Sequence, residues 1–126
     1  MLSKNKMVSK AKKALESLYD GVCTVTKYQK VKKDNGSTGF EEIVEYKDLP
    51  CRLSFKSIDS TSQTENGASA IVQTTTLFLD PDVVIAPGSK ITVTQNNVTT
   101  DYQHSGKAAV YSAHQEIVLD FFRGWS

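Results

Sequence analysis

The stretch from Leu77 to Gln103 restricts the possible folds more than any other part of the chain, because its strands and turns follow one another with almost no spare residues. Asp80-Pro81-Asp82 and Pro87-Gly88 are typical of tight turns, since proline presets φ and glycine accepts a positive φ. Asn96-Asn97 lies between two alternating β-branched segments, and asparagine tolerates left-handed backbone geometry. The stretch therefore predicts antiparallel β structure and leaves no room for catalytic machinery.

Further alternating segments extend this pattern over most of the chain. Strands are expected at residues 22–32, 40–46, 51–58, 70–79 and 115–122, and the first two form a long hairpin with an Asn-Gly tip. Residues 103–107 are expected to form a turn, and residues 108–112 either a short strand or a loop. About seven strands, joined mostly by hairpins, predict a mainly β fold: a small antiparallel β-barrel or sandwich.

At 126 residues the chain is expected to form a single domain, residues 1–126. Within it we expect a basic N-terminal helix over residues 1–21, the barrel over 22–122 and a tail over 123–126. Between Met7 and Tyr19 apolar residues recur with a period near 3.6 and form one stripe opposite the lysines. Ser3 is a candidate cap for the start of this helix, and Asp20-Gly21 would end it. The stripe would pack on its own domain or on a neighbouring subunit, and the sequence does not separate these possibilities.

Charge is distributed unevenly along the chain. Residues 1–33 contain nine lysines and two acids, a charge of +7, whereas residues 34–126 carry a charge of −6. Such asymmetry indicates either an interaction face or a solvated helix surface. Nine lysines without arginine or interleaved aromatic residues favour no sequence-specific nucleic-acid contact, although non-specific proximity to phosphates remains compatible with them.

The strand pattern stops between Asp59 and Ser69, where a single alanine is the only apolar residue. Such a segment is too polar to bury a hydrophobic face, so a long polar loop is expected here. Loops of this length are uncommon in compact domains and are often either functional or disordered.

The residues suited to catalysis or metal binding are few and scattered. The chain has two histidines and lacks the nucleophile-elbow, Walker, dinucleotide-binding and His-Glu-x-x-His motifs. Cys23 and Cys51 are expected to be buried thiols, and they could form a disulfide only if their strands pair closely. Intervals of 10 to 53 residues separate Cys23, Cys51, His104 and His114, which argues against a zinc site. We therefore expect no enzymatic activity, no cofactor and no metal.

The two ends of the chain carry further signals. No apolar run approaches the roughly 20 residues of a membrane helix, and the basic N-terminus lacks the apolar segment of a signal peptide, so an intracellular protein without a membrane partner is expected. Trp125 is the single tryptophan and lies one residue from the C-terminus. An aromatic residue in a tail often anchors it, either on its own domain or on a partner, and both possibilities remain open.

Taken in order, these elements resemble a known family. They are the basic helix, then YDGVCTVTKYQKVKKDNGSTGFEEIVEYKDLPCRLSFKS, the polar segment, TTTLFLDPDVVIAPGSKITVTQNNVTTDYQHSG and finally HQEIVLDFF. Over residues 20–122 this order resembles the head-closure, or stopper, proteins found at the head–tail junction of long-tailed bacteriophages and their prophages. The shared marks are a first hairpin with a glycine-containing tip, a third strand leading into a long polar loop, a strand ending in Asp-Pro-Asp, and a Pro-Gly-Ser-Lys-Ile-Thr-Val entry into the next hairpin. The N-terminal helix is an addition to the simplest version of this pattern.

The resemblance implies a structural role in virion assembly. Such proteins form a ring beneath the portal and its adaptor, close the DNA channel after packaging, and provide the platform on which the tail docks. The implied partners are the portal-side adaptor, tail proteins and further copies of the chain, in a ring of 12 or 6 copies. The ring could form from a protein that is monomeric when alone. Double-stranded DNA would lie near the ring without specific binding. The implied location is the virion head–tail junction, and the host cytoplasm during assembly.

The resemblance also assigns candidate residues. In that family the loop after the third strand forms the channel plug, which here corresponds to the segment from Ser57 to Ala70. The candidate plug residues are Ser57, Asp59, Ser60, Thr61, Ser62, Gln63, Thr64, Glu65, Asn66, Gly67 and Ser69. The candidate docking residues for the adaptor or tail are Asp34, Asn35, Gly36, Lys10, Lys12, Lys13, Arg123 and Trp125.

Two alternative functions remain compatible with the sequence. A tail-completion or terminator protein shares small β-barrel folds and ring assembly with the head-closure proteins. A generic barrel that binds single-stranded nucleic acid would need a face of exposed aromatic and basic residues, and the tyrosines of this chain lie singly in the sequence.

Overall fold

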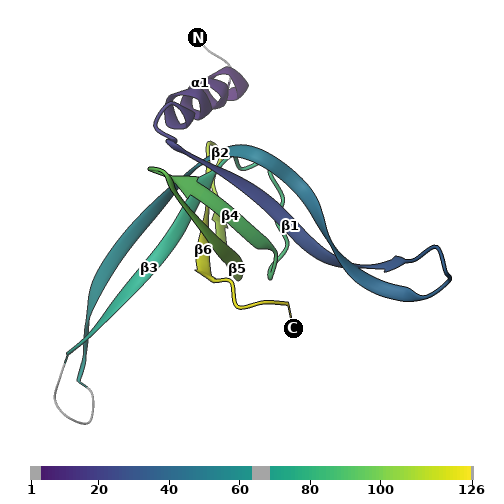
Figure 1. Ribbon diagram of the computed structural model, residues 1–126. Helices are drawn as coiled ribbons and strands as arrows, with labels where there is room; N and C mark the ends of the chain where they lie inside the picture. Colours follow the sequence, from purple (N-terminus) through teal and green to yellow (C-terminus); the bar gives the residue numbers. More distant parts are fainter. Residues whose placement is uncertain (1–3, 64–68, 126) are drawn as a thin grey trace.

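Six antiparallel strands close into a small barrel, and one helix precedes the first strand (Figure 1). The computed structural model describes residues 4–63 and 69–125. The elements are α1 (Lys4–Glu16), β1 (Gly21–Lys32), β2 (Thr38–Gln63), β3 (Ser69–Leu79), β4 (Lys90–Gln95), β5 (Val98–Val110) and β6 (Gln115–Phe121). Around the barrel the strand order is β1-β2-β3-β6-β5-β4. The predicted mainly β fold with an N-terminal helix is confirmed.

The described residues contain six strands rather than about seven, because residues 40–46 and 51–58 belong to one strand, β2. The sequence predicts a break before Cys51, yet Leu49-Pro50 is paired with β1. A bulge lies here instead: the β1–β2 register shifts between Cys23 and Val25, and Asp48 adopts a φ of 53°. A bulge bends a strand and increases its twist, so β2 can change direction without ending.

The length of β2 gives the molecule two projecting hairpins. β1 pairs with β4 as far as Thr26, and β3 pairs with β6 from Thr75 onward. Beyond these points β1 and β2 continue together as what we call the first arm, residues 27–44, and β2 and β3 continue as the second arm, residues 56–63 and 69–74. In Figure 1 the two arms leave the barrel toward opposite sides.

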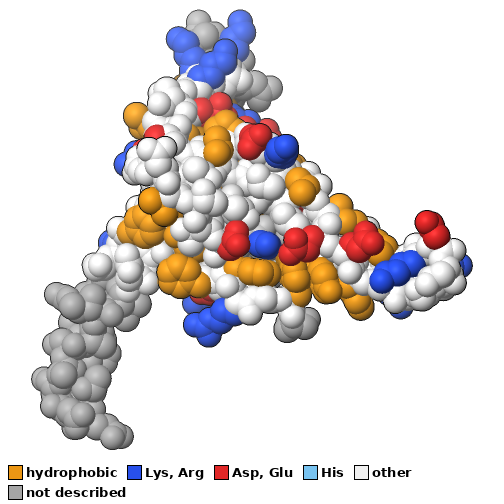
Figure 2. Space-filling view, in the orientation of Figure 1, with side chains coloured by type: hydrophobic (Ala, Val, Ile, Leu, Met, Phe, Trp, Pro, Cys, Tyr) orange, Lys and Arg blue, Asp and Glu red, His pale blue; other side chains and the backbone are white. Residues whose placement is uncertain are grey.

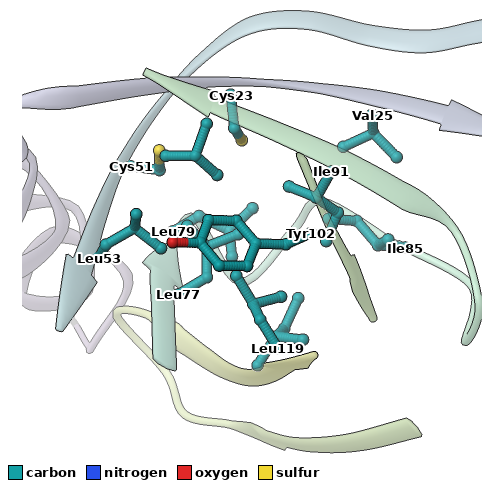
Figure 3. Packing of buried hydrophobic residues seen from close by; sticks show 12 residues of the cluster. Cys23, Val25, Cys51, Leu53, Leu77, Leu79, Ile85, Ile91, Tyr102 and Leu119 are labelled. Carbon is teal, nitrogen blue, oxygen red and sulfur yellow. The ribbon is translucent and has the colours of Figure 1, made fainter. Parts of the chain in front are cut away.

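The strands place alternate side chains in a single apolar core, to which Ile85 is added from the connection between β3 and β4 (Figure 3). Its members are Cys23, Val25, Cys51, Leu53, Leu77, Leu79, Ile85, Ile91, Val93, Tyr102, Ile117 and Leu119. Each fully buried aliphatic side chain contributes about 1.5–3 kcal/mol relative to exposure. Phe55 is expected to share a face with Cys51 and Leu53, yet it is 53% exposed. It pairs with Thr75, where β3 parts from β6, so it lies at the base of the second arm rather than in the core.

The turns predicted at Asp80-Pro81-Asp82, Pro87-Gly88 and Asn96-Asn97 are confirmed. Asn96 and Asn97, between β4 and β5, adopt φ values of 53° and 65°, the left-handed geometry of a tight hairpin. Gly88 has a φ of 84°, which explains the need for glycine after Pro87. At Asp80-Pro81-Asp82 the Asp82 amide donates a 2.8 Å hydrogen bond to Asp80 Oδ1.

The turn predicted at residues 103–107 is wrong, because β5 continues through this segment to Val110. The register against β6 shifts between His104 and Ala108, so the extra residues form a bulge. Gly106 adopts a φ of 96°, and its amide donates a 2.9 Å hydrogen bond to His104 Nδ1. Glycine therefore marks a bulge here rather than a chain reversal.

The N-terminal helix ends at Glu16, one turn earlier than predicted, and its candidate cap Ser3 lies outside the described residues. The half-buried residues in and just after the helix lie along one side: Val8, Lys12, Leu15, Glu16 and Tyr19. The remainder of the apolar stripe is exposed: Met7, Ala11, Ala14 and Leu18. One edge of the stripe is thus covered and the other is open. α1 is neither long nor apolar enough to span a membrane, and the described residues contain no other helix.

Candidate interaction surfaces

The first arm has two different faces, because the register places Tyr28 opposite Glu42 and Lys30 opposite Phe40. We call one side the aromatic face; alternation places on it Tyr28, Lys30, Lys32, Phe40, Glu42 and Val44. The opposite face carries Lys27, Gln29, Val31, Glu41 and Ile43. On the aromatic face Tyr28, Phe40 and Val44 are 43%, 57% and 56% exposed. Figure 2 shows hydrophobic side chains gathered beside acidic ones along this arm.

Trp125 packs on this aromatic face. Its ring stacks on Tyr28 with centroids 5.1 Å apart and an interplanar angle of 7°, and Tyr28 also stacks on Phe40 at 5.3 Å. Its Nε1 donates a 2.9 Å hydrogen bond to Glu42 Oε1, and Phe122 meets its ring edge-on at 5.0 Å. Of the two possibilities left open by the sequence, the structure has the tail anchored on its own chain.

Glu42 joins three elements at the base of the arm. Its carboxylate accepts the hydrogen bond from Trp125 of the tail and lies 3.4 Å from Lys90 Nζ of β4. The same Lys90 ammonium lies 5.0 Å from the centre of the Phe122 ring. The Trp125 hydrogen bond, with the nearby Lys90 charge, holds the pKa of Glu42 below its usual value. The carboxylate is therefore charged at neutral pH.

The tip of the first arm is exposed and held by local hydrogen bonds. Asn35 Oδ1 accepts from the Ser37 amide at 3.0 Å and from the Ser37 hydroxyl at 2.6 Å. The Lys33 amide donates to Ser37 O at 2.8 Å, and Gly36 adopts a φ of 85°. The candidate docking residues Asp34, Asn35 and Gly36 therefore lie together at the end of the arm, where Asn35 shapes the turn.

The segment predicted as a plug loop is largely strand. β2 continues to Gln63 and β3 begins at Ser69, so Ser57, Asp59, Ser60, Thr61, Ser62, Gln63 and Ser69 belong to the second arm. Backbone pairing joins Ser57 to Gln73 and Asp59 to Ile71. The remaining candidates, Thr64, Glu65, Asn66 and Gly67, lie outside the described residues. The long loop is thus corrected to a hairpin whose paired strands reach far beyond the barrel.

A groove of about 500 Å³ lies at the base of the second arm. Gln73 contributes to it from the arm. Phe55, Thr75, Tyr102, Leu119 and Phe121 contribute from the barrel, and the candidate docking residue Arg123 also lines it. The surface is part polar and part apolar. Phe121 is 65% exposed, so the groove opens onto a hydrophobic surface.

The side chain of Gln95 stabilises this base in a way that the sequence does not reveal. β1 begins at Gly21 opposite Cys51, so Leu53 lies beyond the last β1–β2 pair. Gln95 Oε1 accepts a 2.8 Å hydrogen bond from the Leu53 amide, and its Nε2 lies 3.4 Å from Leu53 O. The amide group of Gln95 thus pairs with the β2 backbone as a neighbouring strand would.

Gln115 has a similar role at the opposite end of β3. Gln115 is only 5% exposed, and its Nε2 donates hydrogen bonds to the backbone oxygens of Asp80 and Val83 at 2.8 and 2.6 Å. These bonds hold the Asp80-Pro81-Asp82 turn against β6. A glutamine in line with apolar strand residues was the available sequence signal for both roles.

The candidate docking lysines of α1 differ in their surroundings. Lys12 Nζ lies 2.8 Å from Asp82 Oδ2 and 3.3 Å from Asp80 Oδ1, and these hydrogen bonds raise the pKa of Lys12. Lys12 therefore links the helix to the turn at Asp80-Pro81-Asp82, and its ammonium group is already paired within the chain. Lys10 and Lys13 are exposed on the outer side of the helix.

The two cysteines and the two histidines have different surroundings and do not form a common site. Cys23 and Cys51 are both buried and free, and contact with Cys23 together with burial raises the pKa of the Cys51 thiol. Burial lowers the pKa of His104, whereas His114 lies on the surface 3.7 Å from Glu116. Among residues 4–63 and 69–125, no three potential metal-ligating side chains come together.

Comparisons with known proteins give little further identification. No protein-family model matches the chain, and a search of curated proteins finds no match. Among solved structures, the phage-like element PBSX protein xkdH from Bacillus subtilis is similar over 79% of this chain and 91% of that chain, with 12% sequence identity and a TM-score of 0.46. A similarity at this level carries no inference about function.

Proposed function

We propose that this protein is a structural component of a bacteriophage particle at the head–tail junction, where it closes the DNA channel after packaging and provides the surface on which the tail docks. The observation that carries the proposal is a small closed barrel from which two hairpin arms project. Closure leaves the barrel strands without free edges, whereas the two-stranded arms keep unpaired outer edges that could contact neighbouring subunits. This arrangement fits the head-closure pattern that the sequence resembles.

In this role the second arm carries the channel plug. A plug must extend from the ring into the channel, and paired strands provide such an extension. It must also release DNA, and the sequence between Ser57 and Ala70 contains two acids and no lysine or arginine. A segment without basic residues gives little attraction to phosphates.

The remaining projections are proposed docking points in a homo-oligomeric ring. The first-arm tip around Asn35 and the exposed lysines Lys10 and Lys13 would contact the adaptor or the tail. Rings form through head-to-tail interfaces that close by rotation. The protein would act without catalysis or a cofactor, in the host cytoplasm during assembly and then in the virion.

The test is size exclusion with light scattering, on the protein alone and after mixing with purified DNA-filled, tailless heads. Co-elution with the heads is the expected result. Heads that already carry tails are the matched control, because their junction is complete and should not take up added protein. Absence of association with tailless heads would contradict the junction role and would favour a tail-completion protein.

One observation favours a second candidate, a module that binds single-stranded nucleic acid. Phe40, Tyr28 and Trp125 are brought into contact on the first arm, and Lys30 and Lys32 lie on the same face. Stacked aromatic rings beside lysines suit the bases and phosphates of a single strand. A gel shift with single-stranded DNA over a salt series tests this, and no binding at low salt would exclude it.

A further inference from the structure

Two features predicted separately as docking points, the first arm and the C-terminal tail, form one unit in the structure. Glu42 and Trp125 are 83 residues apart in sequence and are joined by a hydrogen bond. The contact lies at the base of the first arm, since Tyr28 lies two residues beyond the last β1–β4 pair at Thr26 and Glu42 is its partner on β2. We propose that the tail is a clasp that locks the direction of the first arm relative to the barrel.

The tail is attached to the barrel immediately before the clasp. The Phe122 backbone amide donates a 3.1 Å hydrogen bond to Asp101 O of β5, and the Phe122 ring lies beside Lys90 of β4. Trp125 then reaches the arm three residues later. The tail therefore connects β4 and β5 of the barrel to β1 and β2 of the arm.

A glycine makes the return of the tail possible. Gly124 adopts a φ of 105°, a conformation that side chains of L-residues rarely allow. An added Cβ at this position would meet no atom within 4 Å, so a substitution here would act through backbone strain rather than through a clash. Gly124 thus offers a way to weaken the clasp while every aromatic side chain is retained.

The clasp has a consequence for how the arm presents its tip. Beyond Thr26 and Val44 no barrel strand pairs with the arm, which is therefore a two-stranded hairpin. The contact of Trp125 with Tyr28 and Glu42 at its base then limits how far the arm can move relative to the barrel. With Trp125 docked, the tip at residues 34–36 is held in one direction. With Trp125 released, the arm moves freely and its aromatic face is uncovered for a partner. This inference concerns the isolated chain and is independent of the proposed junction role.

Hydrogen exchange of the isolated protein tests the clasp. Trp125→Ala is expected to accelerate exchange of the first-arm amides, residues 27–32 and 38–44, by about tenfold, because aromatic contacts of this kind stabilise by an amount of that order. Exchange in β6 should stay within twofold of wild type, which shows that the barrel is intact. Tyr111→Ala is the matched control, since Tyr111 is an exposed aromatic residue that stacks on His114 elsewhere.

The fluorescence of Trp125 gives a second readout that keeps the aromatic cluster. In wild type the emission should be shielded from acrylamide, and Gly124→Ala should raise quenching by at least twofold. The proposal is overturned if first-arm exchange in Trp125→Ala remains within twofold of wild type. It is equally overturned if Tyr111→Ala accelerates the arm as much, or if wild-type Trp125 is quenched as readily as free tryptophan.

Discussion

Replacing Gln95 by methionine should destabilise the protein through the base of the second arm. The substitution keeps the side-chain length but removes the side-chain amide that bonds to the backbone of Leu53, a residue that is 7% exposed. Leaving a buried backbone amide without a partner costs about 1–3 kcal/mol. The 2.8 Å bond to the Leu53 amide should account for most of this cost, because the 3.4 Å contact to Leu53 O is long. We expect a loss of about 1–2 kcal/mol in the free energy of unfolding.

Urea denaturation measures this loss. With a slope of about 2 kcal/mol per molar, the midpoint should fall by about 0.5–1 M while the slope stays constant. Gln103→Met is the matched control, on a half-buried glutamine of β5 whose side chain makes no hydrogen bond within the described residues. A midpoint within 0.2 M of wild type, which is about 0.4 kcal/mol at that slope, or an equal effect of Gln103→Met, would refute the strand-like role of Gln95.

A double-mutant cycle sharpens the assignment. A Cβ added at Gly21 would lie 3.1 Å from Gln95 Oε1 and 3.2 Å from the backbone oxygens of Cys51 and Thr94. Gly21→Ala should therefore displace the same amide that Gln95→Met removes. The two losses should be less than additive, since the second substitution has less left to disturb.

Three further predictions concern other parts of the molecule. Burial lowers the folded-state pKa of His104, whose Nδ1 accepts a hydrogen bond from the Gly106 amide. The stability that the neutral ring contributes should therefore be lost as pH falls from about 6.5 through that lowered pKa. In His104→Gln the urea midpoints measured at pH 7.5 and at pH 5 should lie closer together than in wild type. Cys23→Ser with Cys51→Ser should lower stability through buried hydroxyls, by about 1–3 kcal/mol each, without abolishing assembly, whereas a chelator should leave the melting temperature unchanged. If the proposed junction role holds, shortening the segment between Ser57 and Ala70 should preserve the fold and the proposed ring but let filled heads leak DNA, and loss of folding would contradict the plug assignment.

Turn residues were the strongest predictors of the fold, because a positive φ restricts residue type locally. Asn96-Asn97 and Pro87-Gly88 occupy the turns expected of them. Gly106 shows the limit of this signal, since a bulge requires the same backbone freedom as a turn. Local chemistry predicts that the chain deviates at such a residue but not whether the neighbouring strand continues beyond it.

The outer part of the second arm, residues 59–63 and 69, was missed because it lacks the usual sequence signal of a strand. The alternation of apolar and polar residues that marks a strand arises from one buried face. Ile58 is the single apolar residue in the sequence from Ser57 to Gln63, so this segment shows no such alternation although β2 and β3 are paired along the arm. The partner of Trp125 was equally invisible, since its contacts with Tyr28 and Glu42 span most of the chain.

The two arms share one strand, so a further measurement asks whether β2 transmits a disturbance between them. Gln95 braces the second arm and Trp125 braces the first, and their side chains contact different residues. Sites without shared partners usually show additive losses within about 0.5 kcal/mol. Gln95→Met combined with Trp125→Ala should therefore lower the free energy of unfolding by the sum of the single losses. A coupling above about 1 kcal/mol would instead mean that β2 carries strain from one arm to the other through the bulge at Asp48, and that the arms move together.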